Sequence, residues 1–260
     1  MKTFLPLLCA ISVVLMTKVS VAEDVQVAVA ANFTKPMEKI AADFEKATGN
    51  KVVASFGATG KFVEQIKNGA PFQVLISADQ KSPIKLEKEE LAVVGTRYTY
   101  AIGKLVLWSA TPGFVDDKGA VLKTSDFQHI SIADPKVAPY GKAAMKVMTK
   151  MGVIDALTPK IVQGDSIAQA KAFVGSGNAE LGFVALSQVI KDGKIGEGSG
   201  WIVSPDLYSP LYQDVVLLKT GENSEAARAL VEYLRTEPAQ AIIKSYGYEL
   251  PKWATTDAKE

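Results

Sequence analysis

Apolar residues in the first third of the chain alternate between strand-type runs and helix-type spacing. Residues 34–48 carry Met37, Ile40 and Phe44 on one helical face, and Gly49 ends that pattern. The expected elements, in order, are a strand at 25–30, a helix at 34–48, a strand at 51–56, a short helix through Phe62, Val63 and Ile66, and a strand at 74–76. This β-α-β-α-β order predicts a mainly parallel sheet with right-handed crossovers.

A second block of the chain shows the same alternation of strands and helices. Its expected elements are strands at 104–109 and 129–133, a helix at 141–151, a strand at 160–162, a helix at 168–174, and strands at 181–184 and 212–218. Two further helices are expected at 224–235 and 238–246. The sequence therefore predicts an α/β protein with two sheets, each flanked by helices.

Two sheets in one chain imply two lobes and two crossings between them. We expect lobe I to comprise residues 23–102 plus 214–260, and lobe II to comprise residues 103–213. Two crossings form a hinge, and the boundary between lobes is a common place for a ligand. The predicted architecture is therefore a two-lobed fold with a ligand cleft between the lobes.

The first 22 residues differ from the rest of the chain. Lys2 precedes an almost unbroken apolar run over 4–16, and Ser20-Val21-Ala22 places small residues just before Glu23. This is the pattern of a secretory signal peptide, cut after Ala22. Lys18 makes the run too short to span a membrane comfortably. We expect residues 1–22 to be removed and the mature protein to be exported.

Removing that segment changes the composition. Lys2 and Lys18 are lost, which leaves 27 basic against 28 acidic residues and changes the net charge from +1 to about −1. The single cysteine, Cys9, is lost too, so no thiol remains for a disulfide or a cysteine-based metal site. No basic block suggests nucleic-acid binding. No later apolar run approaches the length of a membrane span.

Signatures of catalysis are scarce. His129 is the only histidine, and the chain contains no G-x-S-x-G, HExxH or CxxC motif. The turn Gly57-Ala58-Thr59-Gly60-Lys61 resembles a phosphate loop but lacks the Walker spacing, and Phe62 stands where Ser or Thr is needed. Paired acids such as Asp116-Asp117 are more simply explained as solvated. The sequence therefore favours a binding protein without a cofactor over an enzyme.

Four strand-to-helix turns place small or hydroxyl-bearing residues at an expected helix start. These turns are Ala30-Ala31-Asn32, Gly57-Ala58-Thr59, Ala138-Pro139-Tyr140-Gly141 and Gly164-Asp165-Ser166-Ile167. Helix N-termini present free N–H groups and a partial positive charge, which suits an anion. For any single turn, an ordinary N-cap is the simpler interpretation. The anion hypothesis rests on finding four such turns, two from each lobe.

Several segments resemble the periplasmic molybdate-binding proteins of ABC transporters, the ModA family. The most characteristic stretch is 69–80, GAPFQVLISADQ, which is similar to the family's GAPADLFISAD. Other matching segments are 30–33, 55–60, 132–141, 180–184 and 246–248, and the resemblance extends from Val25 to about Pro251. The resemblance implies a two-lobed periplasmic-binding-protein fold that holds an oxyanion in the cleft with uncharged donors.

Carried over residue by residue, the resemblance implies an oxyanion-binding set. Its members are Ala31, Asn32, Thr59, Tyr140 and Ile167, with Ala58, Ser166 and Ala185 as further candidates. Thr59 stands where serine is more usual and Ile167 where valine is frequent. Some members have a tyrosine at the position of Ala185, so the aromatic contribution is expected to come from Tyr140 instead. All are expected to act as hydrogen-bond donors to the metal oxyanion and none as a direct metal ligand.

The resemblance also implies the function. A monomeric protein would capture molybdate or tungstate and deliver it to the membrane permease of an ABC transporter. The alternatives are another solute on the same fold, such as sulfate, phosphate or a small carboxylate, an enzyme on this scaffold, or an adhesion role. A carboxylate site would usually need an arginine, and Arg97, Arg228 and Arg235 all lie outside the four turns.

Overall fold

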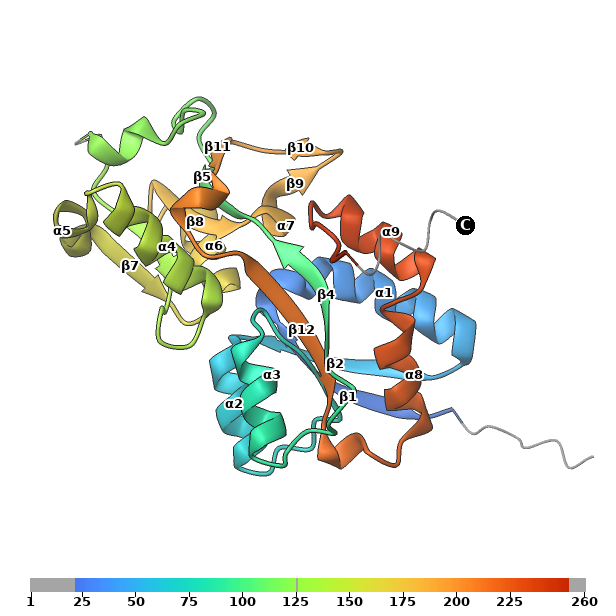
Figure 1. The fold of residues 1–260 in the computed structure, drawn as a ribbon. Helices are drawn as coiled ribbons and strands as arrows, with labels where there is room; N and C mark the ends of the chain where they lie inside the picture. Colours follow the sequence, from blue (N-terminus) through green and yellow to red (C-terminus); the bar gives the residue numbers. More distant parts are fainter. Residues whose placement is uncertain (1–21, 125, 253–260) are drawn as a thin grey trace, which may run out of the picture.

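The computed structural model describes residues 22–124 and 126–252, which form two five-stranded sheets flanked by helices (Figure 1). The sheet of lobe I has the order β2 (Lys51–Gly57), β1 (Asp24–Ala30), β3 (Val74–Ile76), β12 (Leu211–Leu217) and β4 (Tyr98–Gly103). The sheet of lobe II has the order β11 (Ser199–Ile202), β5 (Leu105–Ser109), β8 (Leu181–Ala185), β6 (Ile130–Ala133) and β7 (Ile161–Gly164). A small ribbon pairs β9 (Ile190–Lys191) with β10 (Lys194–Ile195). The predicted two-lobed α/β class is confirmed.

Helices cover both faces of the first sheet. They are α1 (Thr34–Thr48), α8 (Glu225–Tyr233) and α9 (Glu237–Ser245) on one face, and α2 (Thr59–Lys67) and α3 (Lys81–Lys88) on the other. The predicted apolar stripe of α1, Met37, Ile40 and Phe44, is fully buried. Gly49 ends α1 at φ 79°, a left-handed conformation that glycine adopts without a Cβ penalty.

The second sheet is covered by α4 (Pro139–Lys150), α5 (Ile154–Leu157), α6 (Ile167–Gly175) and α7 (Leu186–Val189). Short 3-10 turns lie at Ala31–Phe33, Ala120–Lys123, Thr158–Lys160, Pro205–Leu207 and Lys219–Gly221. The apolar core of lobe II also includes Ala31, Ala58 and Ala78 of lobe I. The two lobes are thus packed against each other where the strand-to-helix turns meet.

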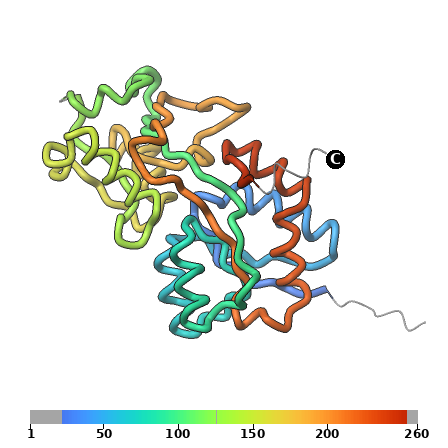
Figure 2. The backbone as a smooth tube through the Cα atoms, in the orientation of Figure 1, coloured from blue at the N-terminus to red at the C-terminus, as the bar shows by residue number. Residues whose placement is uncertain are grey.

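The chain passes between the lobes along two neighbouring strands, β4 and β12 (Figure 2). Lys104 alone separates β4 from β5, and residues 203–210 lead from β11 back to β12. The C-terminal segment adds support, because Ile102 and Glu249 exchange two backbone hydrogen bonds of 2.8 and 3.0 Å. These strands form the connection between lobe I and lobe II.

Each sheet is mixed, which differs from the mainly parallel sheets expected. In lobe I, β2, β1 and β3 are parallel, but β12 runs antiparallel to both β3 and β4. In lobe II, β6 is parallel to β7 and β8, while β5 and β11 add antiparallel pairs. Local periodicity cannot reveal this, because β12 pairs with strands more than 100 residues away. No described helix is long and apolar enough to cross a membrane.

The predicted signal peptide lies, apart from Ala22, outside the described residues. The apolar pattern did not predict α3, α5, α7, β4 or the segment 190–202. Helix α3 has no recognisable apolar stripe, because only Pro83 and Leu86 are buried and most of the other residues are charged. The short strands β9, β10 and β11 lack a distinct period-two pattern.

Candidate functional site

The four turns singled out from the sequence converge on one small cavity between the lobes. Its lining residues are Ala30, Ala31, Asn32, Gly57, Ala58, Thr59, Ala78, Ala138, Pro139, Tyr140 and Ile167. None of these residues is charged. The cavity is small: the centre of a water-sized group can move within a volume of ≈ 10 Å³. The site therefore suits a small ligand held by neutral groups.

Each turn presents the start of a helix. Ala31 begins the 3-10 turn that precedes α1, Thr59 begins α2, Tyr140 is the second residue of α4, and Ile167 begins α6. The first N–H groups of a helix have no partner within it, and the helix dipole places partial positive charge there. Four such ends from two lobes meet at one cavity, an arrangement that favours an anion.

Thr59 is a hydroxyl-bearing residue among those that line this cavity. It is 1% exposed, and its hydroxyl oxygen accepts a hydrogen bond of 3.0 Å from the backbone N–H of Ala78. Because Ala78 occupies one acceptor site of the hydroxyl, the O–H is left to donate in another direction. A fixed donor of this kind is suited to a ligand that only accepts hydrogen bonds.

Asn32 lines the cavity, but its side chain is committed to the protein. Its Nδ2 donates to Oε1 of Gln213 at 2.9 Å and to the hydroxyl of Tyr248 at 2.8 Å. Its backbone carbonyl oxygen accepts from the hydroxyl of Ser187 at 2.7 Å. The group that Asn32 can offer to a ligand is consequently its backbone N–H, at the start of a helix.

Tyr140 is also committed through its side chain. Its hydroxyl accepts a hydrogen bond of 3.0 Å from Nε2 of Gln213, and the residue is 1% exposed. Burial raises the pKa of Tyr140 well above its usual value near 10, so the phenol stays neutral. Tyr140 therefore offers the cavity its backbone N–H, at the second position of α4.

Gln213 is the centre of a buried polar network that joins the lobes. Its Oε1 accepts from Asn32 and from the hydroxyl of Tyr100 at 3.0 Å, while its Nε2 donates to Tyr140 of lobe II. Gln213 is fully buried beside an irregularity in the pairing of β12 with β4. A satisfied network of this kind fixes the geometry of the residues it joins, here two of the four turns.

Two predicted site residues do not line the cavity. Ser166 is the N-cap of α6, and its hydroxyl accepts from the backbone N–H of Gln169. Ala185 is fully buried at the end of β8, and its N–H donates to Oε1 of Gln188 at 3.0 Å. Gln188 in turn donates to the carbonyl of Ile167 at 3.1 Å. The positions of Ser166 and Ala185 therefore support the fourth turn from outside the cavity.

The network around Gln213 was not predicted from the sequence. Tyr100, Gln213 and Tyr248 lie on strands or near the C-terminus, and their partners are 23 to 216 residues away. The one available signal was the polar pair Gln213-Asp214 in a strand run whose next residues are all apolar. Such residues, once buried, must find partners.

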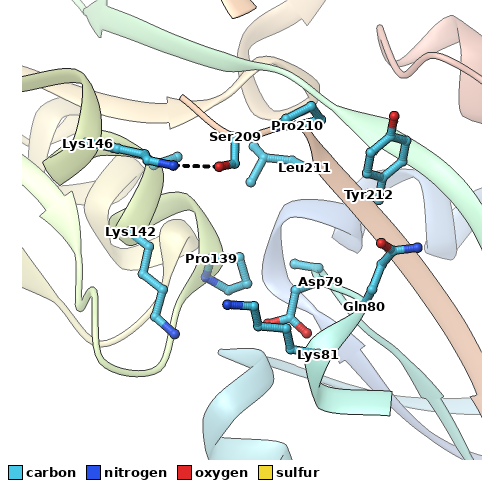
Figure 3. Close-up of a pocket in the computed structure, with 12 residues that line it drawn as sticks. Asp79, Gln80, Lys81, Pro139, Lys142, Lys146, Ser209, Pro210, Leu211 and Tyr212 are labelled. Atoms are coloured by element: carbon cyan, nitrogen blue, oxygen red, sulfur yellow. Dashed lines mark hydrogen bonds between the residues drawn. The ribbon is translucent and has the colours of Figure 1, made fainter. Parts of the chain in front are cut away.

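A larger groove adjoins the cavity and shares Ala78 and Pro139 with it. It has a volume of ≈ 360 Å³ and is bordered by Lys81 of α3 and by Lys142 and Lys146 of α4. Lys146 donates to the hydroxyl of Ser209 at 2.6 Å. Lys81 of lobe I and the two lysines of lobe II border the same groove (Figure 3). Asp79 is the only acidic residue among the groove's lining residues. The groove therefore carries net positive charge beside the neutral cavity.

Groups suited to metal binding or catalysis are scarce elsewhere. Residues 22–124 and 126–252 hold no cluster of three His, Cys, Asp or Glu side chains that could bind a metal ion. His129 is more than half exposed on its side chain, and its backbone N–H donates to Glu180. The chemistry that the described site supports is reversible binding of a small anion.

Comparisons with known proteins agree with this class. The family model of bacterial extracellular solute-binding proteins matches residues 25–249. The molybdate-binding protein ModA of Azotobacter vinelandii is 59% identical over 244 residues, covering 94% of this chain and 97% of the relative. ModA of Rhodobacter capsulatus is 56% identical over 227 residues, with coverage of 87% and 88%. The solved periplasmic molybdate-binding protein of Azotobacter vinelandii has a TM-score of 0.85 at 44% identity, covering 88% of this chain and 100% of that one.

The fold and the neutral cavity between two lobes define a solute-binding protein of the periplasmic type. The chain belongs to the family of bacterial extracellular solute-binding proteins and, within it, to the ModA branch.

Proposed function

We propose that this protein captures molybdate, with tungstate as an equivalent ligand, and delivers it to the permease of an ABC transporter. The observation that carries the proposal is the uncharged cavity at which four helix starts from two lobes converge. The relatives at 59% and 56% identity are named molybdate-binding proteins. We further propose that the protein acts as a monomer in the periplasm after removal of residues 1–22, without a cofactor.

The donors we propose are those already on the cavity wall. The backbone N–H groups of Ala31, Asn32, Tyr140 and Ile167 and the hydroxyl of Thr59 would hydrogen-bond the oxyanion, with Ala58 completing the wall. Ser166 and Ala185 would support the fourth turn without touching the ligand. A hydrogen bond to a charged acceptor is roughly twice as strong as a neutral one, so several neutral donors can hold a dianion without an arginine.

Selectivity follows from the same donors. A fully deprotonated tetrahedral anion accepts at every oxygen, whereas a protonated phosphate must also donate. A site that offers only donors would leave that O–H unsatisfied, at a cost of about 1–3 kcal/mol. Sulfate is also a dianion, so its rejection has to come from the size of the closed cavity, because S–O bonds are shorter than Mo–O bonds.

Calorimetry on the mature protein, stripped of ligand, tests the proposal. Molybdate and tungstate should bind at one site per chain, and sulfate and phosphate should bind much more weakly. A thermal shift provides an independent readout, since a ligand at 100 times its Kd adds about 2.7 kcal/mol of stability. A response to sulfate or phosphate without any response to molybdate or tungstate would refute the proposed substrate.

A further inference from the structure

The two lobes touch directly at the rim of the cavity. The backbone N–H of Gly60, in the first turn of α2, donates to the carbonyl oxygen of Val137 at 2.9 Å. Gly60 follows the cavity residue Thr59, and Val137 precedes the cavity residues Ala138 and Pro139. This bond therefore joins a lobe I turn to a lobe II turn beside the proposed donors.

The contact leaves no room for a side chain at position 60. A Cβ on Gly60 would lie 2.9 Å from Cα, 3.0 Å from Cβ and 3.0 Å from the carbonyl oxygen of Val137. These are backbone and Cβ atoms, so they cannot swing aside as the tip of a long side chain would. Gly60 lies within α2 and does not have a positive φ, so the local backbone conformation does not itself require glycine. Glycine is required instead by the close approach of Val137 in lobe II.

A second contact bridges the lobes one residue further on. Nζ of Lys61 lies 2.9 Å from Oδ2 of Asp165, two residues before Ile167 in the fourth turn. The two side chains are 45% and 78% exposed, and exposed ion pairs contribute little in water. The ion pair can favour the approach of the two lobes slightly, but the steric fit at Gly60 must have the larger effect on it.

We propose that Gly60 sets how far the lobes close on the anion and thereby determines affinity without touching the ligand. The absence of a side chain lets α2 of lobe I meet Val137 of lobe II, which brings the four helix starts within reach of one small anion. Lys61 and Asp165 assist as a minor rim pair. The inference rests on the proposed function, because molybdate is the ligand whose binding closure serves.

The variant Gly60→Ala tests this inference because closure and helix stability respond in opposite directions. Alanine is the better helix former, so ligand-free protein should keep or slightly raise its Tm. Overpacking the closed interface should weaken molybdate binding about 5- to 150-fold, mainly through faster dissociation. X-ray scattering at saturating molybdate should show a less compact protein than the wild type.

Gly175→Ala is the matched control. Gly175 ends α6, has no positive φ, and a Cβ there meets nothing within 4 Å. Its molybdate affinity should equal that of the wild type. If Gly60→Ala folds and binds molybdate as tightly as Gly175→Ala, the inference is wrong. If the wild type itself fails to bind molybdate, the proposed function fails instead, and the two failures are distinguishable.

Charge reversal tests the rim pair separately. Lys61→Asp and Asp165→Lys should each weaken molybdate binding, by about two- to fivefold at low salt, and the double variant should recover most of the loss. Wild-type affinity in both single variants would show that the ion pair does not contribute to closure of the lobes.

Discussion

The small cavity and the neighbouring groove share Ala78 and Pro139 but differ in their chemistry. The cavity has no charged lining residue, and its volume is ≈ 10 Å³. The groove is larger, at ≈ 360 Å³, and is bordered by Lys81, Lys142 and Lys146. An anion would thus pass from a groove bordered by lysines into a small neutral cavity lined mostly by buried residues.

The difference shows that holding an anion and attracting one need different groups. In a buried site, fixed N–H and O–H donors interact strongly because little water screens them. A buried lysine would itself have to be desolvated, at a cost that its attraction for the anion does not always offset. Exposed lysines contribute little to affinity but raise the local concentration of an approaching anion. The proposed division is that neutral helix starts set affinity and lysines set the rate of encounter.

The largest expected effect follows from placing a negative charge in the neutral cavity. Thr59→Asp puts a carboxylate at the start of α2, where it would compete with the oxyanion for the same N–H groups. We expect a loss of molybdate affinity of more than about a thousandfold, from like-charge repulsion in a poorly solvated site. The ligand-free protein should fold, because an acid at a helix start interacts favourably with the dipole. Calorimetry measures the loss.

Thr59→Ser is the matched control for that substitution. It keeps the hydroxyl that accepts from Ala78 and should bind molybdate within about fivefold of the wild type, since only a methyl group is lost. Near-normal binding by Thr59→Asp would show that the anion does not occupy this cavity.

The second effect concerns the network behind the cavity. Gln213→Leu keeps the side chain's size but leaves one N–H of Asn32 without an acceptor and removes the donor to the Tyr140 hydroxyl. Tyr100 keeps the carbonyl of Ser77 as an acceptor. Each buried polar group left without a partner costs about 1–3 kcal/mol. For a chain of this size, Tm should fall by about 2–4 °C for each kcal/mol lost. Molybdate affinity should fall as well, because Asn32 and Tyr140 lose a common anchor.

The control is Gln65→Leu, a substitution at an exposed position on α2. It should leave both Tm and affinity close to the wild-type values. Equal melting temperatures for the Gln213 and Gln65 variants would show that the network does not stabilise the joined lobes.

A smaller effect is expected from alkaline pH. Burial raises the pKa values of Tyr100, Tyr140 and Tyr248 in the folded protein above the ordinary value of about 10. In the unfolded chain these phenols ionise near pH 10, while in the folded protein they stay neutral. Their contribution to stability is therefore fully present below pH 10 and declines as pH rises from 10 toward the folded pKa values.

Thermal melts across the alkaline range test this dependence. The three tyrosines should not change Tm between pH 7 and 9, and they should lower it above pH 10. Tyr140→Phe should show a shallower fall, because one of the groups that ionise only on unfolding is removed. An identical alkaline slope in both proteins would contradict the assignment for Tyr140.

The sequence predicted the fold and the location of the cavity better than it predicted the use of each side chain. Ala31, Thr59, Tyr140 and Ile167 share a local signal, a strand end followed by a helix start, and the fold brings these ends to one cavity. Local signals of this kind need only neighbouring residues. For the same reason α1 was predicted closely, from the spacing of its apolar residues.

The network and the antiparallel strands could not be predicted in this way. Asn32, like Thr59, is a residue typical of helix starts, yet its amide donates a hydrogen bond to Gln213, 181 residues away. Nothing near Asn32 in the sequence specifies that partner. Likewise, β4 and β12 obtain their pairing from tertiary contacts across more than 100 residues. Only the folded structure shows which polar groups are already satisfied.

The smallest expected effect tests the charged half of the comparison. Replacing Lys81, Lys142 and Lys146 with glutamine removes the positive charge of the groove without changing any residue that lines the cavity. At low salt the association rate of molybdate should fall about two- to tenfold, because the steering field is lost. The dissociation rate should be unchanged, since none of the three lysines lines the cavity. Stopped-flow fluorescence measures both rates.

Salt and a distant lysine provide the controls for this last variant. At 1 M salt the Debye length is about 3 Å, so the association rates of variant and wild type should converge. Lys244→Gln on α9 removes one exposed charge from the face of lobe I covered by α1, α8 and α9, and it should change neither rate. A faster dissociation rate in the triple variant would show that the lysines hold the anion as well as attract it. The neutral helix starts would then not account for affinity on their own.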